Sequence, residues 1–223
     1  MVFDEDGVCD ACRYAVMKDK LIDWEKREDE LIKLLDKYRR NDGKHDVLVP
    51  GSGGKDSCLA AHLLKYKYGM HPLTCTWPPH IYTDIGWKNF QDWINIGGFD
   101  NILFTPNGKV HRLLTKLAFV NLLHPFQPFI IGQKYLAPKI AKQQGIKLVF
   151  FGENEAEYGN PIAENKTPVR DNRYYTKRSL SDVHLSGVTF QCLIDKYGLN
   201  MNDLEVYLPP DEEETNRSKT KVH

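Results

Sequence analysis

The residues best suited to chemistry lie together at positions 45–57, in the stretch HDVLVPGSGGKDS. Its glycines let the backbone bring N–H groups close to an anion, which bulkier residues would hinder. Ser52 and Ser57 add hydroxyl donors, and Lys55 adds a full positive charge. A phosphate would repel the carboxylate of Asp56, so this residue indicates either a bound divalent metal or a helix-capping role. The stretch therefore predicts a loop that holds phosphate.

Two regular elements are expected to position this loop. Residues 46–49 form a short, apolar and mainly β-branched run that is typical of a buried strand. Residues 57–68 read as a helix, and the first turn of a helix offers unpaired N–H donors and a partial positive charge. Strand, turn and helix together would form the phosphate cradle. An ordinary glycine- and serine-rich turn is the alternative interpretation.

The spacing excludes two common phosphate-binding patterns. A P-loop needs a glycine separated by four residues from the Gly-Lys pair and a serine or threonine after the lysine, but Val49 and Asp56 occupy those positions. The dinucleotide pattern G-x-G-x-x-G is absent around Gly51 and Gly53. Residues 52–57, SGGKDS, instead match the SGGxDS signature of the PP-loop ATP pyrophosphatases, which this stretch resembles.

Composition narrows the class of protein. The 223 residues suffice for one sizeable domain, alone or with appendages, and the formal net charge is zero. This balance gives no reason to expect a nucleic acid or an acidic membrane surface as partner. No apolar run approaches the roughly 20 residues of a membrane span, and the acidic start MVFDEDG is unlike a signal peptide. Five scattered cysteines argue against a disulfide scaffold, so the cytoplasm is the expected location.

Cys9 and Cys12 form a C-x-x-C motif near the start of the chain. Such a motif supplies half of a typical zinc site, which usually has four ligands. The remaining cysteines, at positions 58, 75 and 192, do not form a second pair. The motif is therefore a candidate Zn²⁺ site or, alternatively, a pair of exposed thiols without a metal.

Thr76 is a candidate for nucleotide binding. Residues 71–77 read as the second strand, and ligands of α/β sheets lie beyond the carboxyl ends of the strands. Thr76 and Trp77, at that end, could border a nucleotide base. The other expected elements are helices at 23–40, 86–96, 110–122, 188–197 and 202–207, a strand at 99–105, and a charged, disordered end at 211–223.

Lys134 is a candidate catalytic residue. It ends the apolar segment FIIGQK, and the pattern predicts that a helix begins just after it, at Leu136, with Pro138 in the first turn. Lys134 would then lie near a helix N-terminus, where its charge could contact phosphate or substrate. A purely structural role is the alternative.

Glu153 and Glu155 belong to the segment GENEAEYGN, which follows an expected fourth strand at 147–151. Three carboxylates and two amides in one loop after a strand suit a metal or a polar substrate. A solvated acidic loop is the alternative.

The strand–helix alternation predicts an α/β fold with a Rossmann-like parallel sheet and flanking helices. We expect an N-terminal segment at 1–45, a PP-loop domain at 46–160 and a C-terminal segment at 161–223.

Several motifs together resemble the N-acetyl sugar amidotransferases, a family of PP-loop enzymes. They are GVCDAC, VPGSGGKDS, TWPPH, FIIGQK and GENEAEYGN. The resemblance implies an ATP- and Mg²⁺-dependent conversion of an acetamido group to an acetamidino group on a sugar nucleotide or amino sugar, in lipopolysaccharide biosynthesis. It also implies ammonia from a glutaminase partner. Members of the family usually extend beyond both ends of this sequence, so a shortened form is expected.

The resemblance implies roles for the residues of SGGKDS. Asp56 would bind Mg²⁺, and Lys55 and Asp56 are catalytic candidates. Lys134, Glu153 and Glu155 are further catalytic candidates from the character of their own segments, to which the resemblance assigns no role. The pyrophosphate end of ATP would be held by Ser52, Gly53, Gly54, Lys55, Asp56 and Ser57. Two alternatives remain: a PP-loop enzyme that thiolates tRNA, which zero net charge disfavours, and a nucleotide-binding fragment without catalysis.

Overall fold

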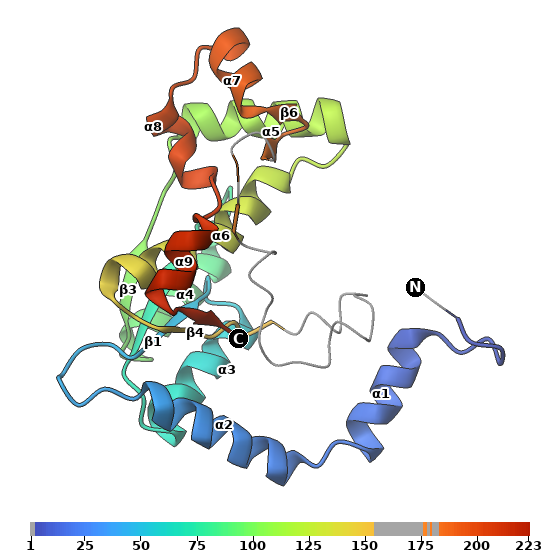
Figure 1. Ribbon diagram of the computed structural model, residues 1–223, viewed down its shortest axis with the longest axis vertical. Helices are drawn as coiled ribbons and strands as arrows, with labels where there is room; N and C mark the ends of the chain where they lie inside the picture. The colour runs from blue at the N-terminus through green and yellow to red at the C-terminus, as the bar shows by residue number, and fades with distance from the viewer. Residues whose placement is uncertain (1–2, 154–175, 178, 180–182) are drawn as a thin grey trace.

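The computed structural model describes residues 3–153, 176–177, 179 and 183–223. Its centre is a parallel five-stranded sheet in the order β3-β2-β1-β4-β7 (Figure 1). The strands are β1 (Val47–Pro50), β2 (Pro72–Thr76), β3 (Asp100–Leu103), β4 (Leu148–Val149) and β7 (Lys221–Val222). This arrangement confirms the predicted α/β class with a parallel sheet and flanking helices.

Helices cover both faces of the sheet, so its central strands are buried on both sides. Leu48 of β1 belongs to one hydrophobic cluster, whereas Val47 and Val49 belong to the other, as the alternation of side chains along a strand requires. The cluster around Leu48 is built with α5 (Gly108–Leu122) and α6 (Gln127–Gln144). The second cluster takes side chains from α2 (Trp24–Tyr38), α3 (Lys55–His62) and α4 (Asp84–Asn95).

The remaining elements lie around this core. The π-helix η1 (Leu63–Lys67) continues α3. The helix α1 (Asp10–Lys20) stands apart from the sheet, at the right of Figure 1. After the undescribed stretch come β5 (His184–Leu185), β6 (Val188–Thr189), α7 (Phe190–Tyr197), α8 (Met201–Leu204), the 3₁₀-helix η6 (Glu205–Tyr207) and α9 (Glu212–Ser218). None of the helices in the described ranges is both long and apolar enough to cross a membrane.

The helix around Lys134 begins earlier than the sequence predicts. α6 starts at Gln127, so Lys134 lies in its interior rather than near its N-terminus, and Pro138 is also internal. Within this helix, Gly132 leaves room for the indole of Trp77. A Cβ atom at Gly132 would lie 2.3 Å from Cε2 of that ring. The prediction of a helix start at Leu136 was wrong, since Pro138 was taken as a first-turn residue.

The predicted disorder at 211–223 also differs from the structure. α9 and β7 occupy this segment, and β7 pairs in parallel with β4. Lys221 N donates to Lys147 O over 2.9 Å, and His223 N donates to Val149 O over 2.8 Å. Val222 is only 1% exposed. One buried apolar residue within a charged sequence is too weak a local signal to predict a strand. The strand conformation is stabilised instead by its backbone pairing with β4.

Candidate functional site

A cavity of about 450 Å³ opens at the carboxyl ends of β1, β2 and β4. The chain places β2 and β3 on one side of β1 and β4 on the other, so the direction of the crossovers reverses between β1 and β4. Such a switch point leaves a crevice beyond the strand ends, where α/β proteins bind ligands. The cavity is lined by Pro50, Gly51, Ser52, Gly54, Asp56, Ser57, Cys75, Trp77, Ile130, Gln133, Lys134, Leu136, Phe151, Gly152 and Glu153.

The loop at 51–54 is held tightly against its neighbours. Gly51 N donates to the carbonyl of Cys75 over 2.9 Å, which joins the loop to β2. Gly53 has φ of +87°, and a Cβ there would lie 2.7 Å from both N and Cα of Phe90. A side chain at this position would therefore be strained and would also collide with the backbone of α4. This packing explains why the turn requires a glycine at position 53.

Gly54 has a different environment from Gly53. It is the N-cap of α3, and among the described residues no side chain caps the helix there and no atom lies within 4 Å of a Cβ placed at Gly54. The N–H groups of the first turn of α3 consequently have no side-chain cap and lie at the cavity. An uncapped helix N-terminus with a partial positive charge suits a phosphate group.

The polar side chains of the loop surround this helix end. Ser52, Asp56 and Ser57 line the cavity, whereas Gly53 and Lys55 do not belong to its lining. Ser57 Oγ donates to the carbonyl of Gly54 over 3.1 Å. Lys55 Nζ pairs with Asp56 Oδ1 at 2.7 Å, with side chains 89% and 56% exposed. Such exposed pairs contribute little to stability, so both groups are available to a ligand without a large energetic cost.

The segment after β4 forms the opposite wall. Phe151, Gly152 and Glu153 line the cavity. A Cβ at Gly152 would lie 2.7 Å from the backbone of Asp56 and Ser57, so this glycine permits direct contact with the first turn of α3. The close approach brings the carboxylates of Glu153 and Asp56 to one cavity. Glu155 lies outside the described residues.

α6 supplies the third wall. Ile130, Gln133, Lys134 and Leu136 line the cavity from this helix. Lys134 therefore lies at the same cavity as Ser52 and Asp56, but from the interior of a helix rather than near its N-terminus. The apolar lining residues, such as Ile130 and Phe151, were not identified from the sequence, because apolar side chains carry no signal that separates a cavity wall from the core.

Thr76 does not line the cavity. Its side chain is fully buried and accepts a hydrogen bond from Asn101 Nδ2 at 3.1 Å. Side chains alternate along β2, so Cys75 is turned to the cavity instead, and Trp77 beyond the strand also lines it. Burial raises the pKa of the Cys75 thiol to about 12, which keeps it protonated at neutral pH. A thiolate nucleophile is not provided by this cysteine.

Cys9 and Cys12 lie at the start of α1, and neither lines the cavity. Cys9 is the N-cap of α1, and its Sγ accepts from Cys12 N at 3.4 Å. This hydrogen bond to the backbone lowers the pKa of the Cys9 thiol. In the ranges that the structure describes, no third histidine, cysteine or carboxylate joins the two thiols in a metal-binding group. The prediction of zinc at this motif has no further support.

Comparison with known proteins finds solved structures whose folds are similar to this one. No protein-family model and no curated protein matches the chain. An NH3-dependent NAD synthetase from Campylobacter jejuni is similar with a TM-score of 0.43 and 15% identity, over 61% of this chain and 59% of that chain. An NMN synthetase from Francisella tularensis is similar with a TM-score of 0.47 and 16% identity, over 87% and 84%. Similarity at these values transfers no activity.

Proposed function

We propose that this protein is an ATP-dependent enzyme of the PP-loop type, which splits ATP into AMP and pyrophosphate. One observation carries the proposal: SGGKDS forms the end of the turn after β1 and the first turn of α3, and this helix start lies at a cavity of about 450 Å³ at the switch point of the sheet. The open space at Gly54 leaves room for a phosphate group to approach the backbone.

Mg²⁺ fits the oxygen donors of the same cavity. Among the described residues, Asp56 and Glu153 are the carboxylates that line it, and Mg²⁺ prefers carboxylate ligands together with phosphate oxygens. When bound, Mg²⁺ would neutralise charge on the phosphates. The backbone N–H groups of residues 52–57 and the hydroxyl of Ser52 would hold the pyrophosphate end of ATP. Lys55 would contribute a positive charge at the mouth of the site.

For the acceptor, the resemblance of the motifs favours the acetamido group of a sugar. An amide carbonyl is a poor electrophile, and adenylation of its oxygen provides AMP as a leaving group. The amide oxygen attacks the α-phosphorus of ATP and pyrophosphate leaves; ammonia then attacks the amide carbon, AMP leaves with the oxygen, and loss of a proton gives the amidine. Lys134 would stabilise negative charge at the α-phosphate, and Glu153 would accept the proton.

Ammonia and location complete the proposal. Trp77 and Phe151 present apolar surface to the cavity, and such surface would limit attack by water on the activated carbon. We propose that a glutaminase partner supplies the ammonia, because free ammonia is mostly protonated at neutral pH and ammonium is no nucleophile. The proposed location is the cytoplasm.

Release of pyrophosphate from ATP tests the function. We expect release over many turnovers that depends on both an N-acetyl sugar nucleotide and ammonium chloride, because ammonia must discharge the adenylated amide before the next ATP reacts. Asp56→Ala should lower it at least about 100-fold, since it removes the proposed metal ligand at the phosphates. Asp29→Asn, an exposed carboxylate change on α2, is the matched control and should leave the rate unchanged. Circular dichroism of each variant checks the fold.

Each other result points to a different conclusion. Release that requires tRNA instead of the sugar would identify a thiolation-type enzyme and reject the sugar acceptor. Binding of ATP without release under any condition would indicate a nucleotide-binding protein without catalysis. A rate for Asp56→Ala equal to that of the parent would remove Asp56 from the catalytic machinery.

A further inference from the structure

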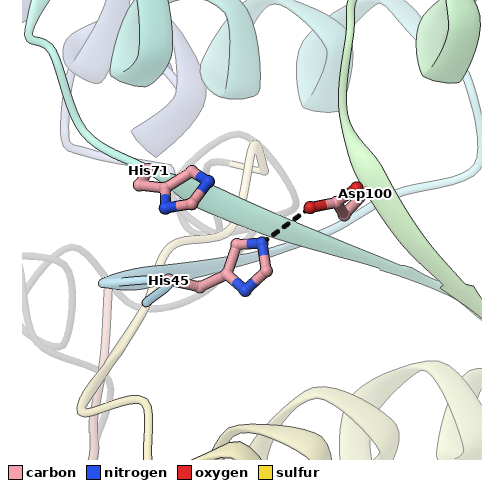
Figure 2. Close-up of side chains that lie close together, drawn as sticks. All are labelled: His45, His71 and Asp100. Carbon is pink, nitrogen blue, oxygen red and sulfur yellow. Dashed lines mark hydrogen bonds and ion pairs between the residues drawn. The ribbon is translucent and has the colours of Figure 1, made fainter. Parts of the chain in front are cut away.

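A second group of side chains with metal-binding chemistry lies at the end of the sheet opposite the cavity. His45 precedes β1, His71 precedes β2, and Asp100 is the first residue of β3, so three adjacent strands begin at one place (Figure 2). An extended chain rises about 3.3 Å per residue, which separates His45 from Gly51 by up to about 20 Å. The group is therefore distinct from the cavity and independent of the proposed function.

We propose that His45, His71 and Asp100 bind a transition-metal dication of the Zn²⁺ type. His45 Nε2 and Asp100 Oδ2 are 3.0 Å apart, and the three potential ligand atoms all lie within 4.8 Å of one another. Two ligand atoms that are each about 2.1 Å from a tetrahedral ion are about 3.4 Å apart. The first pair is already near this separation, and His71 needs a shift of little more than about 1 Å, which its exposed side chain permits.

The backbone beneath the ligands is fixed, although their side chains are accessible. The buried carboxylate of Asp46 accepts a hydrogen bond from His71 N at 2.8 Å, and Asp46 N donates to His71 O at 3.2 Å. Thr74 Oγ1, also fully buried, donates to the carbonyl of Asp100 at 2.8 Å. The rings of His45 and His71 lie with centroids 4.5 Å apart. The strand starts are thus held in register, and binding would require only side-chain rotation.

The ligand types select the class of metal. Two imidazoles and one carboxylate suit Zn²⁺, Co²⁺ or Ni²⁺, whereas Mg²⁺ and Ca²⁺ prefer sites made of oxygen. Three protein ligands leave a fourth tetrahedral position for water. Among the described residues, no other group of three or more such side chains meets the same distance criterion. A bound ion would link strand starts that are 55 residues apart in the chain.

Titration with Zn²⁺ tests the proposal, using protein without a histidine tag. Cys9→Ser and Cys12→Ser are included in the parent, so that the thiols cannot contribute. We expect one Zn²⁺ per chain in competition with a chromogenic chelator, a rise in the thermal unfolding midpoint, and visible absorption when Co²⁺ replaces Zn²⁺. His45→Gln and His71→Gln should each weaken Zn²⁺ binding at least about 100-fold. Substitution of a residue that only hydrogen-bonds to a metal ligand typically weakens binding by about 10–100-fold.

Two further variants make the outcome decisive. Asp100→Asn removes a ligand charge from an exposed position and should weaken binding at least about tenfold. His124→Gln, an exposed histidine outside the group, should bind Zn²⁺ like the parent. Equal affinity in the parent and in the three variants at His45, His71 and Asp100, or no Zn²⁺ binding once the cysteines are replaced, would overturn the proposal. Circular dichroism of the metal-free variants confirms that each is folded before titration.

Discussion

At the scale of single residues, the neighbouring glycines 53 and 54 serve different purposes. Gly53 has a positive φ and touches the backbone of Phe90, so its requirement comes from the fold. Gly54 has an ordinary φ of −74° and meets none of the described residues within 4 Å, so none of these excludes a methyl group there. A requirement for Gly54 would therefore come from the ligand.

Alanine substitutions separate these purposes. Gly53→Ala should lower the free energy of unfolding by at least about 2 kcal/mol. The new methyl group would collide with the backbone of Phe90, and alanine at a positive φ is strained. Gly54→Ala should change it by less than about 1 kcal/mol, yet weaken ATP binding at least tenfold by filling the cradle. Urea denaturation and equilibrium binding of ATP measure the two effects. Equal loss of stability in both variants would contradict this division.

At the scale of elements, a buried polar contact joins α5 to η6. His111 Nδ1 and the hydroxyl of Tyr207 are 2.8 Å apart, and the His111 residue is only 9% exposed. Burial, and secondarily the nearby His80, lowers the pKa of His111 to about 4. Burial also raises the pKa of Tyr207. Both groups are therefore neutral at pH 7, and the contact is a hydrogen bond between uncharged partners.

This contact predicts a dependence of stability on pH. In the unfolded chain, His111 binds a proton once the pH falls below the ordinary histidine pKa of about 6.5. In the folded protein, it binds this proton only when the pH falls to about 4. Its contribution is complete above pH 6.5 and is lost as the pH falls from 6.5 to 4. Between pH 7 and 4.5, the parent should lose about 2 kcal/mol more than His111→Gln.

Urea denaturation at the two pH values measures the difference. His124→Gln, which removes an exposed histidine, is the control and should behave like the parent. Parallel losses in the parent and in His111→Gln would show that His111 does not carry this pH dependence.

At the scale of the whole molecule, the C-terminal strand supports the cavity from a distance. β7 pairs with β4, and the carbonyl of His223 accepts a hydrogen bond from Phe151 N at 2.7 Å. Phe151 begins the segment that lines the cavity opposite the phosphate loop. The last residues of the sequence thus hold a wall of the site whose main loop lies at positions 51–57.

Shortening the buried side chain of β7 tests this support. Val222→Ala should lower the free energy of unfolding by about 1–3 kcal/mol, because it removes buried methyl groups and leaves a void. It should also raise the Kd for ATP, since the Phe151 segment loses part of its anchor. Lys221→Ala changes an exposed neighbour on the same strand and should affect neither quantity. An unchanged Kd in a destabilised Val222→Ala protein would show that β7 serves only stability.

Local signals in the sequence were sufficient for much of the fold. The apolar run at 46–49, the glycine turn and the periodic helices are readable over a few residues, because backbone conformation and side-chain period act at short range. SGGKDS predicted a phosphate loop in the same way. These signals determined the parallel α/β class and the candidate residues Ser52, Asp56 and Ser57, all of which line the cavity.

Only the tertiary structure decided which segments meet. Side-chain alternation and pairing across the sheet turned Cys75 toward the cavity and Thr76 away from it, and the close fit of Gly132 to Trp77 packs α6, which carries Lys134, against the cavity. The same pairing adds β7, with Val222, to the sheet as its fifth strand and brings His45, His71 and Asp100 close together. Such contacts join residues far apart in the chain, and their energy depends on complementary surfaces that no short stretch of sequence contains.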